Sequence, residues 1–197
     1  MSKADPASQK KERNKAIRWV ATIFLVTIAI SAVISLISEE VMAISGTITA
    51  FIILLAIIVV GIIFDILGVA VTSADDKPFH SMAARKVPGS KEAIWLLRNA
   101  ERVSSICNDV IGDICGVVSG AASATIAARI LSNFEFSWPR LITLIMSSVV
   151  AGLTVGGKAL GKGFAIRSST KIVHTAGRVI RFFKQIPQFF SKKQTKR

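Results

Sequence analysis

Two long uncharged apolar segments lie close to the N-terminus, and they constrain the fold more than any other feature of the chain. They cover residues 19–38 and 41–64, and the charges between them are Glu39 and Glu40. A helix of about 20 apolar residues is long enough to cross the roughly 30 Å hydrocarbon core of a membrane. The segments therefore predict two successive membrane-spanning helices, joined by a short turn at the two glutamates.

The first apolar segment is too long for the core of a typical signal peptide, which has about 7–15 apolar residues. No convincing small-x-small cleavage site follows it. We therefore expect a retained membrane helix, preceded by a basic arm over residues 1–18.

Two more apolar segments lie in the second half of the chain. Residues 103–131 form the third predicted span, and a fourth begins at Pro139. Between the second and third spans, residues 75–102 mix charged with apolar side chains and are broken by two prolines and a glycine. This pattern predicts a membrane-surface helical hairpin. The predicted fold class is an all-α integral membrane protein with four transmembrane helices, this hairpin, and a basic amphipathic C-terminal helix.

The charge of the chain indicates what it contacts. The chain is 51% hydrophobic, with a mean hydropathy of +0.55, a formal net charge of +13 and a pI near 10.4. Its cations lie in blocks beside apolar segments, which favours anionic lipid headgroups over nucleic acid as the partner. In residues 167–197, apolar side chains recur at the spacing of one helix face, as in a helix lying on a membrane: Ile172, Ala176, Val179, Phe183 and Ile186.

The distribution of Lys and Arg predicts the orientation. Residues 1–18 hold 6 of them, residues 75–102 hold 6 and residues 158–197 hold 11, so 23 of 25 lie on one side of a four-span protein. Cytoplasmic loops carry such an excess. We expect a multi-pass protein of the cell (plasma) membrane with both termini cytoplasmic. Its parts are a cytoplasmic arm (1–18), a transmembrane domain (19–166) and a cytoplasmic tail (167–197).

Catalytic patterns are missing from the sequence, so we do not expect an enzyme. His80 and His174 are far apart, and there is no phosphate loop and no metal-type Cys/His spacing. The Gly112-Asp113 pair resembles the end of the intramembrane aspartyl protease motif, but Val110 stands where that motif needs glycine.

Three carboxylates and one amide interrupt the apolar pattern of the second and third spans. At 1.5 Å per residue, Asp65 lies about 13 Å from the cytoplasmic end of its span, and Asp109 and Asp113 lie about 10 and 16 Å from the end of theirs. Asn108 is next to Asp109. A carboxylate deep in the bilayer costs about 2.5 kcal/mol or more, so it needs a partner. A hard cation held by oxygen ligands is one such partner.

A structural network explains the same residues. Lys158 and Lys162 of the fourth span approach the same surface and could neutralise an aspartate, and Asn108 could bond a backbone carbonyl of another helix. The acids could also be protonated and inert. Small residues four apart in the third span predict close helix packing, within the chain or between chains: Gly112, Gly116 and Gly120.

Three segments carry a resemblance to a known family. They are GVAVTSAD at 68–75, KEAIWLLRNAERVSSICNDVIGD at 91–113 and VGGKALGKGFAI at 155–166. They resemble signature stretches in the transmembrane domain of the CNNM/CorC (CorB) magnesium-transporter family, over about residues 50–170. The resemblance implies a three-span domain with a surface hairpin after its first span, a homodimer, and Mg²⁺ bound among polar side chains. The first helix is then an addition, and the cytoplasmic CBS domains of longer members are missing.

The chain departs from the family pattern at several positions. Gly157-Lys158 stands where the family has Gly-Glu, and Gly112 stands where a second asparagine is expected. The signature serine and glutamate of the first stretch are replaced, and Ser73 is among the nearest hydroxyls. The metal ligands that the resemblance and the polar pattern together predict are Ser73, Asn108, Asp109 and Asp113, with Asp65 in support.

Two functions follow from these residues. The first is the handling of a divalent cation, with Mg²⁺ as the transported or bound ion. The alternative is a non-transporting membrane scaffold or regulator on a degenerate transporter fold, in which Lys158 takes the place of the cation. The first needs the carboxylates to face one cavity, and the second needs them paired with Lys158 or Lys162.

Overall fold

The structure, a computed structural model, describes residues 6–133 and 138–191, and in these ranges every regular element is a helix. Four stretches are long and apolar enough to cross a membrane: Ile17–Met42, Thr47–Ser73, Ala100–Asn133 and Pro139–Arg167. The predicted all-helical, four-span, multi-pass architecture is confirmed at this level. The elements in chain order are α1 (Pro6–Ile44), α2 (Thr47–Ser73), α3 (Lys77–Ala84), α4 (Ser90–Arg98), α5 (Ala100–Ser105), η1 (Ile106–Gly112), α6 (Asp113–Asn133), α7 (Pro139–Arg167) and α8 (Ser169–Ser191).

The predicted turn at Glu39 and Glu40 is wrong. Helix α1 continues through both residues to Ile44, and the chain turns at Ser45 and Gly46 instead. Glutamate is a good helix former, so a pair of them at the end of an apolar segment need not end the helix. Gly46 precedes α2 in an extended conformation and marks the break.

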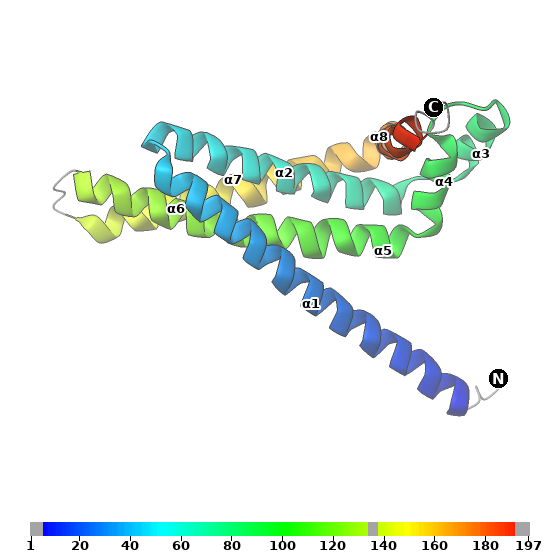
Figure 1. The fold of residues 1–197 in the computed structure, drawn as a ribbon, viewed down its shortest axis with the longest axis horizontal. Coiled ribbons are helices and arrows are strands. Elements are labelled where there is room, and N and C mark those ends of the chain that lie inside the picture. Colours follow the sequence, from blue (N-terminus) through cyan, green and yellow to red (C-terminus); the bar gives the residue numbers. More distant parts are fainter. Residues whose placement is uncertain (1–5, 134–137, 192–197) are drawn as a thin grey trace.

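A three-helix bundle of α2, α6 and α7 forms the centre of the molecule (Figure 1). Leu54 and Ile58 of α2 pack with Ala122 and Ile126 of α6 and with Val150 of α7. Apolar side chains also cover the outside of the bundle, among them Val59, Leu144 and Leu160. In water such a surface would be unstable, whereas in a membrane it faces lipid.

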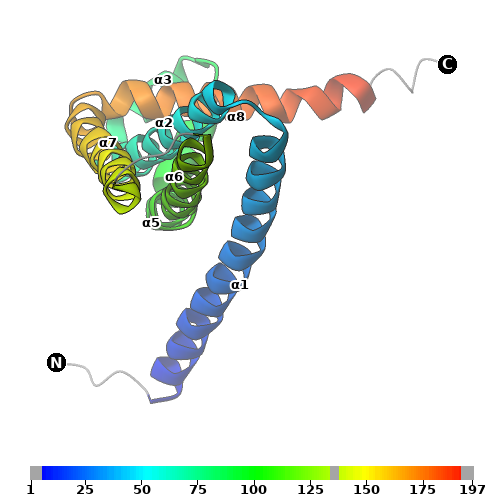
Figure 2. The same cartoon turned by 90° about the vertical axis from the view of Figure 1, so that its left-hand side faces the viewer.

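Helix α1 runs obliquely across α6 and stands apart from the bundle over much of its length (Figure 2). Ile23 and Ile34 of α1 pack against a row of α6 and η1 side chains, Val110, Ile114 and Val118. The guanidinium of Arg102 lies 5.2 Å above the ring of Trp19. At the other end, Arg129 of α6 donates to the carbonyl oxygens of Met42 and Ser45, which fixes the end of α1.

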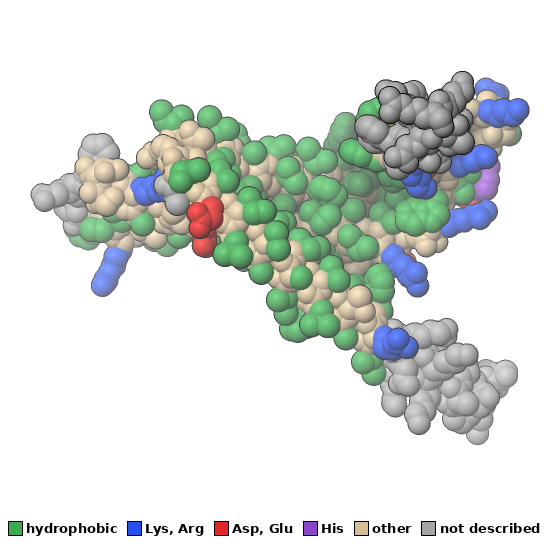
Figure 3. All heavy atoms as spheres, viewed as in Figure 1, with side chains coloured by type: hydrophobic (Ala, Val, Ile, Leu, Met, Phe, Trp, Pro, Cys, Tyr) green, Lys and Arg blue, Asp and Glu red, His purple; other side chains and the backbone are tan. Residues whose placement is uncertain are grey.

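The short helices α3 and α4 and the first half of α8 pack together at one end of the bundle. Phe79 of α3, Ala93 and Leu96 of α4 and Val173 of α8 are all buried, and they close over Val71 of α2. Lys and Arg side chains gather at this end, whereas the middle of the molecule is hydrophobic (Figure 3). The start of α2, the end of α6 and the start of α7 lie at the opposite end (Figure 1).

Two glycines bring α4 and α8 into backbone contact. A Cβ added at Gly177 of α8 would lie 2.4 Å from the Gly89 carbonyl oxygen and 2.9 Å from the Ala93 nitrogen. Gly89 has a φ of 86°, a left-handed conformation that other residues rarely adopt. His174 of α8 holds the same turn, with its Nε2 3.2 Å from the Pro88 carbonyl oxygen.

Replacing Gly177 with alanine should therefore loosen α8 from α4. Overpacking against a fixed backbone costs about 1–3 kcal/mol, so we expect the free energy of unfolding in mixed micelles to fall by that amount. Gly163→Ala in α7 is the control, because its added Cβ would meet no described atom of another element within 4 Å. Equal stability of the two variants would contradict the close contact.

Candidate functional site

Asp65 of α2 is the one buried carboxylate among the described residues, with 4% of its surface exposed. Lys158 of α7 points to it, with its Nζ 3.8 Å from Asp65 Oδ1. The same ammonium donates to the Gly112 carbonyl oxygen of η1 at 3.4 Å. A carboxylate, an ammonium and a backbone carbonyl from three helices therefore meet inside the bundle.

Glycines make room for this meeting point. A Cβ at Gly112 would lie 3.3 Å from Lys158 Nζ, and one at Gly61 of α2 would lie 2.9 Å from Cys115 Cβ of α6. At Gly68, one turn beyond Asp65, a Cβ would lie 2.1 Å from Asn108 Oδ1. Small residues let helices approach closely in membranes, and here they let the Asn108 side chain lie directly against α2.

The third span is not a regular α-helix, because residues 106–112 form the π-helical segment η1. In a π-helix the carbonyl oxygen of each residue accepts a hydrogen bond from the backbone N–H five residues later, which makes the turn wider than in an α-helix. Such segments often occur at functional sites. The polar side chains of this region are tied locally: Asn108 Nδ2 donates to Ser104 Oγ at 3.2 Å, and Ser105 Oγ donates to Asp109 Oδ2 at 2.8 Å. The wide turn places the Gly112 carbonyl within reach of Lys158.

The five predicted metal ligands do not gather at one point. Asp65 is buried beside Lys158, and Asn108 is half-buried against Gly68. Asp109 and Asp113 are both exposed, and Ser73 is exposed at the end of α2. Within the described ranges, no three His, Cys, Asp or Glu side chains lie close enough together to hold a metal ion.

Two oxygens in this region have no hydrogen-bond partner within the described part of the chain, Asp65 Oδ2 and Asn108 Oδ1. Both are buried, and an unpaired buried oxygen costs about 1–3 kcal/mol. A water molecule that donates to them or a small cation would satisfy them. These two oxygens are therefore the atoms of the site that could bind a ligand.

Sequence reasoning identified Lys158 as a partner for an aspartate but missed the carbonyl that the lysine also binds. Lys162, the other lysine predicted as a possible partner, is exposed one turn further along α7. The role of Arg129 was also missed, although an isolated arginine in a helix of small residues is a usable signal. A charge at that position needs acceptors, and the end of α1 supplies them.

No protein-family model, curated protein or solved structure matches this chain. The assignment of function therefore depends on the geometry of the site and on the chemistry of its side chains.

Proposed function

We propose that the chain is a non-transporting membrane scaffold, built on a transporter-like helical bundle in which Lys158 occupies the place of a cation. The observation that supports this proposal is the contact between Lys158 Nζ and Asp65 Oδ1. A divalent cation at Asp65 would lie beside an ammonium, and unscreened like charges in a poorly polarisable interior repel strongly. The lysine stands where the CNNM/CorC family has a glutamate, so the resemblance and the contact support the same proposal.

The scaffold presents a basic surface at one end. The α3–α4 hairpin and α8 lie on the cytoplasmic face of the membrane and contact anionic lipid headgroups. Helix α8 supports this placement because it packs Ile172, Val173 and Ala176 inward and leaves Lys171 and Lys184 exposed. Each such cation contributes about 1 kcal/mol of attraction near an anionic leaflet.

The outer face of η1 and α6 is the proposed homodimer surface. It exposes the carboxylates of Asp109 and Asp113 at a depth where lipid would surround them. Along the same helix, Cβ atoms added at Gly116 and Gly120 would meet no described atom of another element within 4 Å. A second copy can therefore approach this face closely at the two glycines.

Magnesium handling is the competing function, and it is favoured by two oxygens that lack a hydrogen-bond partner among the described residues, Asp65 Oδ2 and Asn108 Oδ1. Flux into liposomes that contain a magnesium-sensitive dye separates the two functions. A scaffold gives the same flux as empty liposomes. Magnesium entry that Asp65→Asn abolishes would contradict the scaffold and establish transport.

The proposed orientation predicts which positions a membrane-impermeant maleimide reaches in intact cells. In a background with Cys107→Ala and Cys115→Ala, a cysteine at Glu39 should react from outside, because it lies in the last turns of α1, which ends at Ile44 on the outer side. A cysteine at Lys91 should react only after permeabilisation, because α4 lies on the cytoplasmic side. Both side chains are exposed, so access is set by the membrane. Labelling at Lys91 in intact cells would overturn the orientation.

A further inference from the structure

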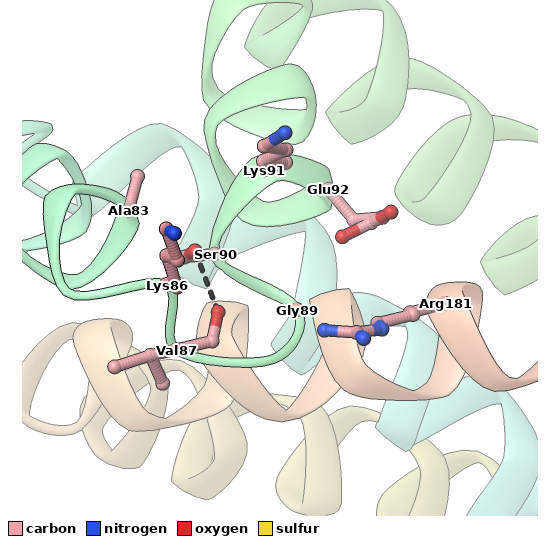
Figure 4. Close-up of a pocket in the computed structure, with 8 residues that line it drawn as sticks. All are labelled: Ala83, Lys86, Val87, Gly89, Ser90, Lys91, Glu92 and Arg181. Atoms are coloured by element: carbon pink, nitrogen blue, oxygen red, sulfur yellow. Dashed lines mark hydrogen bonds between the residues drawn. The ribbon is translucent and has the colours of Figure 1, made fainter.

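A second polar region lies at the α3–α4 end of the molecule, formed by residues that the Asp65 site does not use. A pocket of about 410 Å³ opens there between the turn before α4 and the side of α8 (Figure 4). Its charged lining residues are Lys86, Lys91, Glu92 and Arg181. Three cations and one carboxylate give the pocket a net positive formal charge, so it favours an anion.

The backbone of the α3–α4 turn forms one wall of this pocket. Lys86 has a φ of 57°, a left-handed conformation that is uncommon for a residue with a side chain. Gly89 follows in the same region of φ, and Ser90 Oγ donates to the Val87 carbonyl at 2.7 Å, which closes the turn. The turn thus leads directly into the first residues of α4 beside the cavity (Figure 4).

Helix α8 supplies the third cation because of its glycine contact. Gly177 lies against Gly89 with no room for a Cβ, and Arg181 is one turn further along α8. The Arg181 side chain consequently extends toward the turn at Gly89 (Figure 4). The start of α4 adds N–H groups that lack acceptors within the helix, and helix starts favour negative charge.

We propose that this pocket binds one phosphate monoester group, either the headgroup of an anionic lipid such as phosphatidic acid or a soluble phosphate. A compact, multiply charged anion can contact two ammonium groups and a guanidinium together, and arginine matches the geometry of phosphate oxygens. The lipid source depends on the proposed function, which places this end at the membrane surface. Basic pockets on the cytoplasmic side of membrane helices are where headgroups bind.

The test uses the full-length chain in neutral detergent, titrated with dioctanoyl phosphatidic acid, with inorganic phosphate or with glycerol 3-phosphate. The pocket variant carries Lys86→Gln, Lys91→Gln and Arg181→Gln. The control variant carries Lys77→Gln, Arg98→Gln and Lys171→Gln, which remove the same charge from exposed positions on α3, α4 and α8. We expect saturable binding that weakens roughly tenfold or more in the pocket variant and less than about threefold in the control. Arg181→Gln alone should weaken it several-fold.

The three ligands identify the source of the phosphate. Pocket-dependent binding of inorganic phosphate or glycerol 3-phosphate indicates a soluble ligand, and pocket-dependent binding of phosphatidic acid alone indicates a lipid. Equal weakening in the two triple variants, or no saturable binding of any ligand, would overturn the pocket proposal. The maleimide labelling of a cysteine at Lys91 tests the membrane-surface placement separately. If that cysteine reacts in intact cells while pocket-dependent binding in detergent persists, the cytoplasmic placement fails and the pocket stands.

Discussion

Replacing Lys158 with methionine should lower the free energy of unfolding by about 3 kcal/mol, because it leaves the buried Asp65 carboxylate without its counter-charge. The Gly112 carbonyl would lose its ammonium donor at the same time. Equilibrium unfolding in mixed micelles measures the loss. Lys162→Met is the matched control, since it removes the same charge from an exposed position one turn along α7 and should cost less than about 0.5 kcal/mol.

A second substitution should recover much of this loss. In the double variant Asp65→Asn, Lys158→Met, no uncompensated charge is buried, so we expect at least half of the lost stability to return. An effect of Lys158→Met no larger than that of Lys162→Met would show that the contact does not compensate Asp65. Failure of Asp65→Asn to rescue the lysine variant would indicate that the lysine acts mainly through Gly112.

Replacing Arg129 with methionine should cost about 2–3 kcal/mol and release the end of α1. Its guanidinium donates to the Met42 and Ser45 carbonyl oxygens, and hydrogen bonds from a charged group contribute about 1.5–3 kcal/mol. Arg140→Met is the control, because Arg140 is exposed near the start of α7. Limited proteolysis should cut the Arg129→Met variant faster near Ser45. Equal cleavage of the two variants would contradict the role of Arg129.

The spans could be predicted because membrane crossing depends on the length and polarity of a segment, which a sequence displays directly. The arginine that fixes α1 and the true position of the turn could not be predicted in this way. The charges of Glu39 and Glu40 predict a break, but their helix propensity and the glycine at position 46 decide where α1 ends.

The candidate site was only partly predictable for a geometric reason. Depth along a helix follows from residue number, so Asp65 and Lys158 could be placed at similar levels. Which carboxylate the lysine meets depends on how each helix is rotated about its axis. The π-helical segment η1 alters the rotation of the third span, so spacing could not show how Asp109 and Asp113 lie relative to Lys158. The phosphate pocket depends on contact between Gly89 and Gly177, which are distant in sequence.

The most direct test of the central claim, that Lys158 and not a divalent cation compensates Asp65, is a melting curve of the wild-type protein in detergent with and without millimolar magnesium. A ligand that binds only the folded state raises the melting temperature by mass action. Our account predicts no magnesium-dependent shift in wild type, with calcium and a matched monovalent salt as controls for ionic strength. A shift that is specific to magnesium and disappears in Asp65→Asn would contradict it.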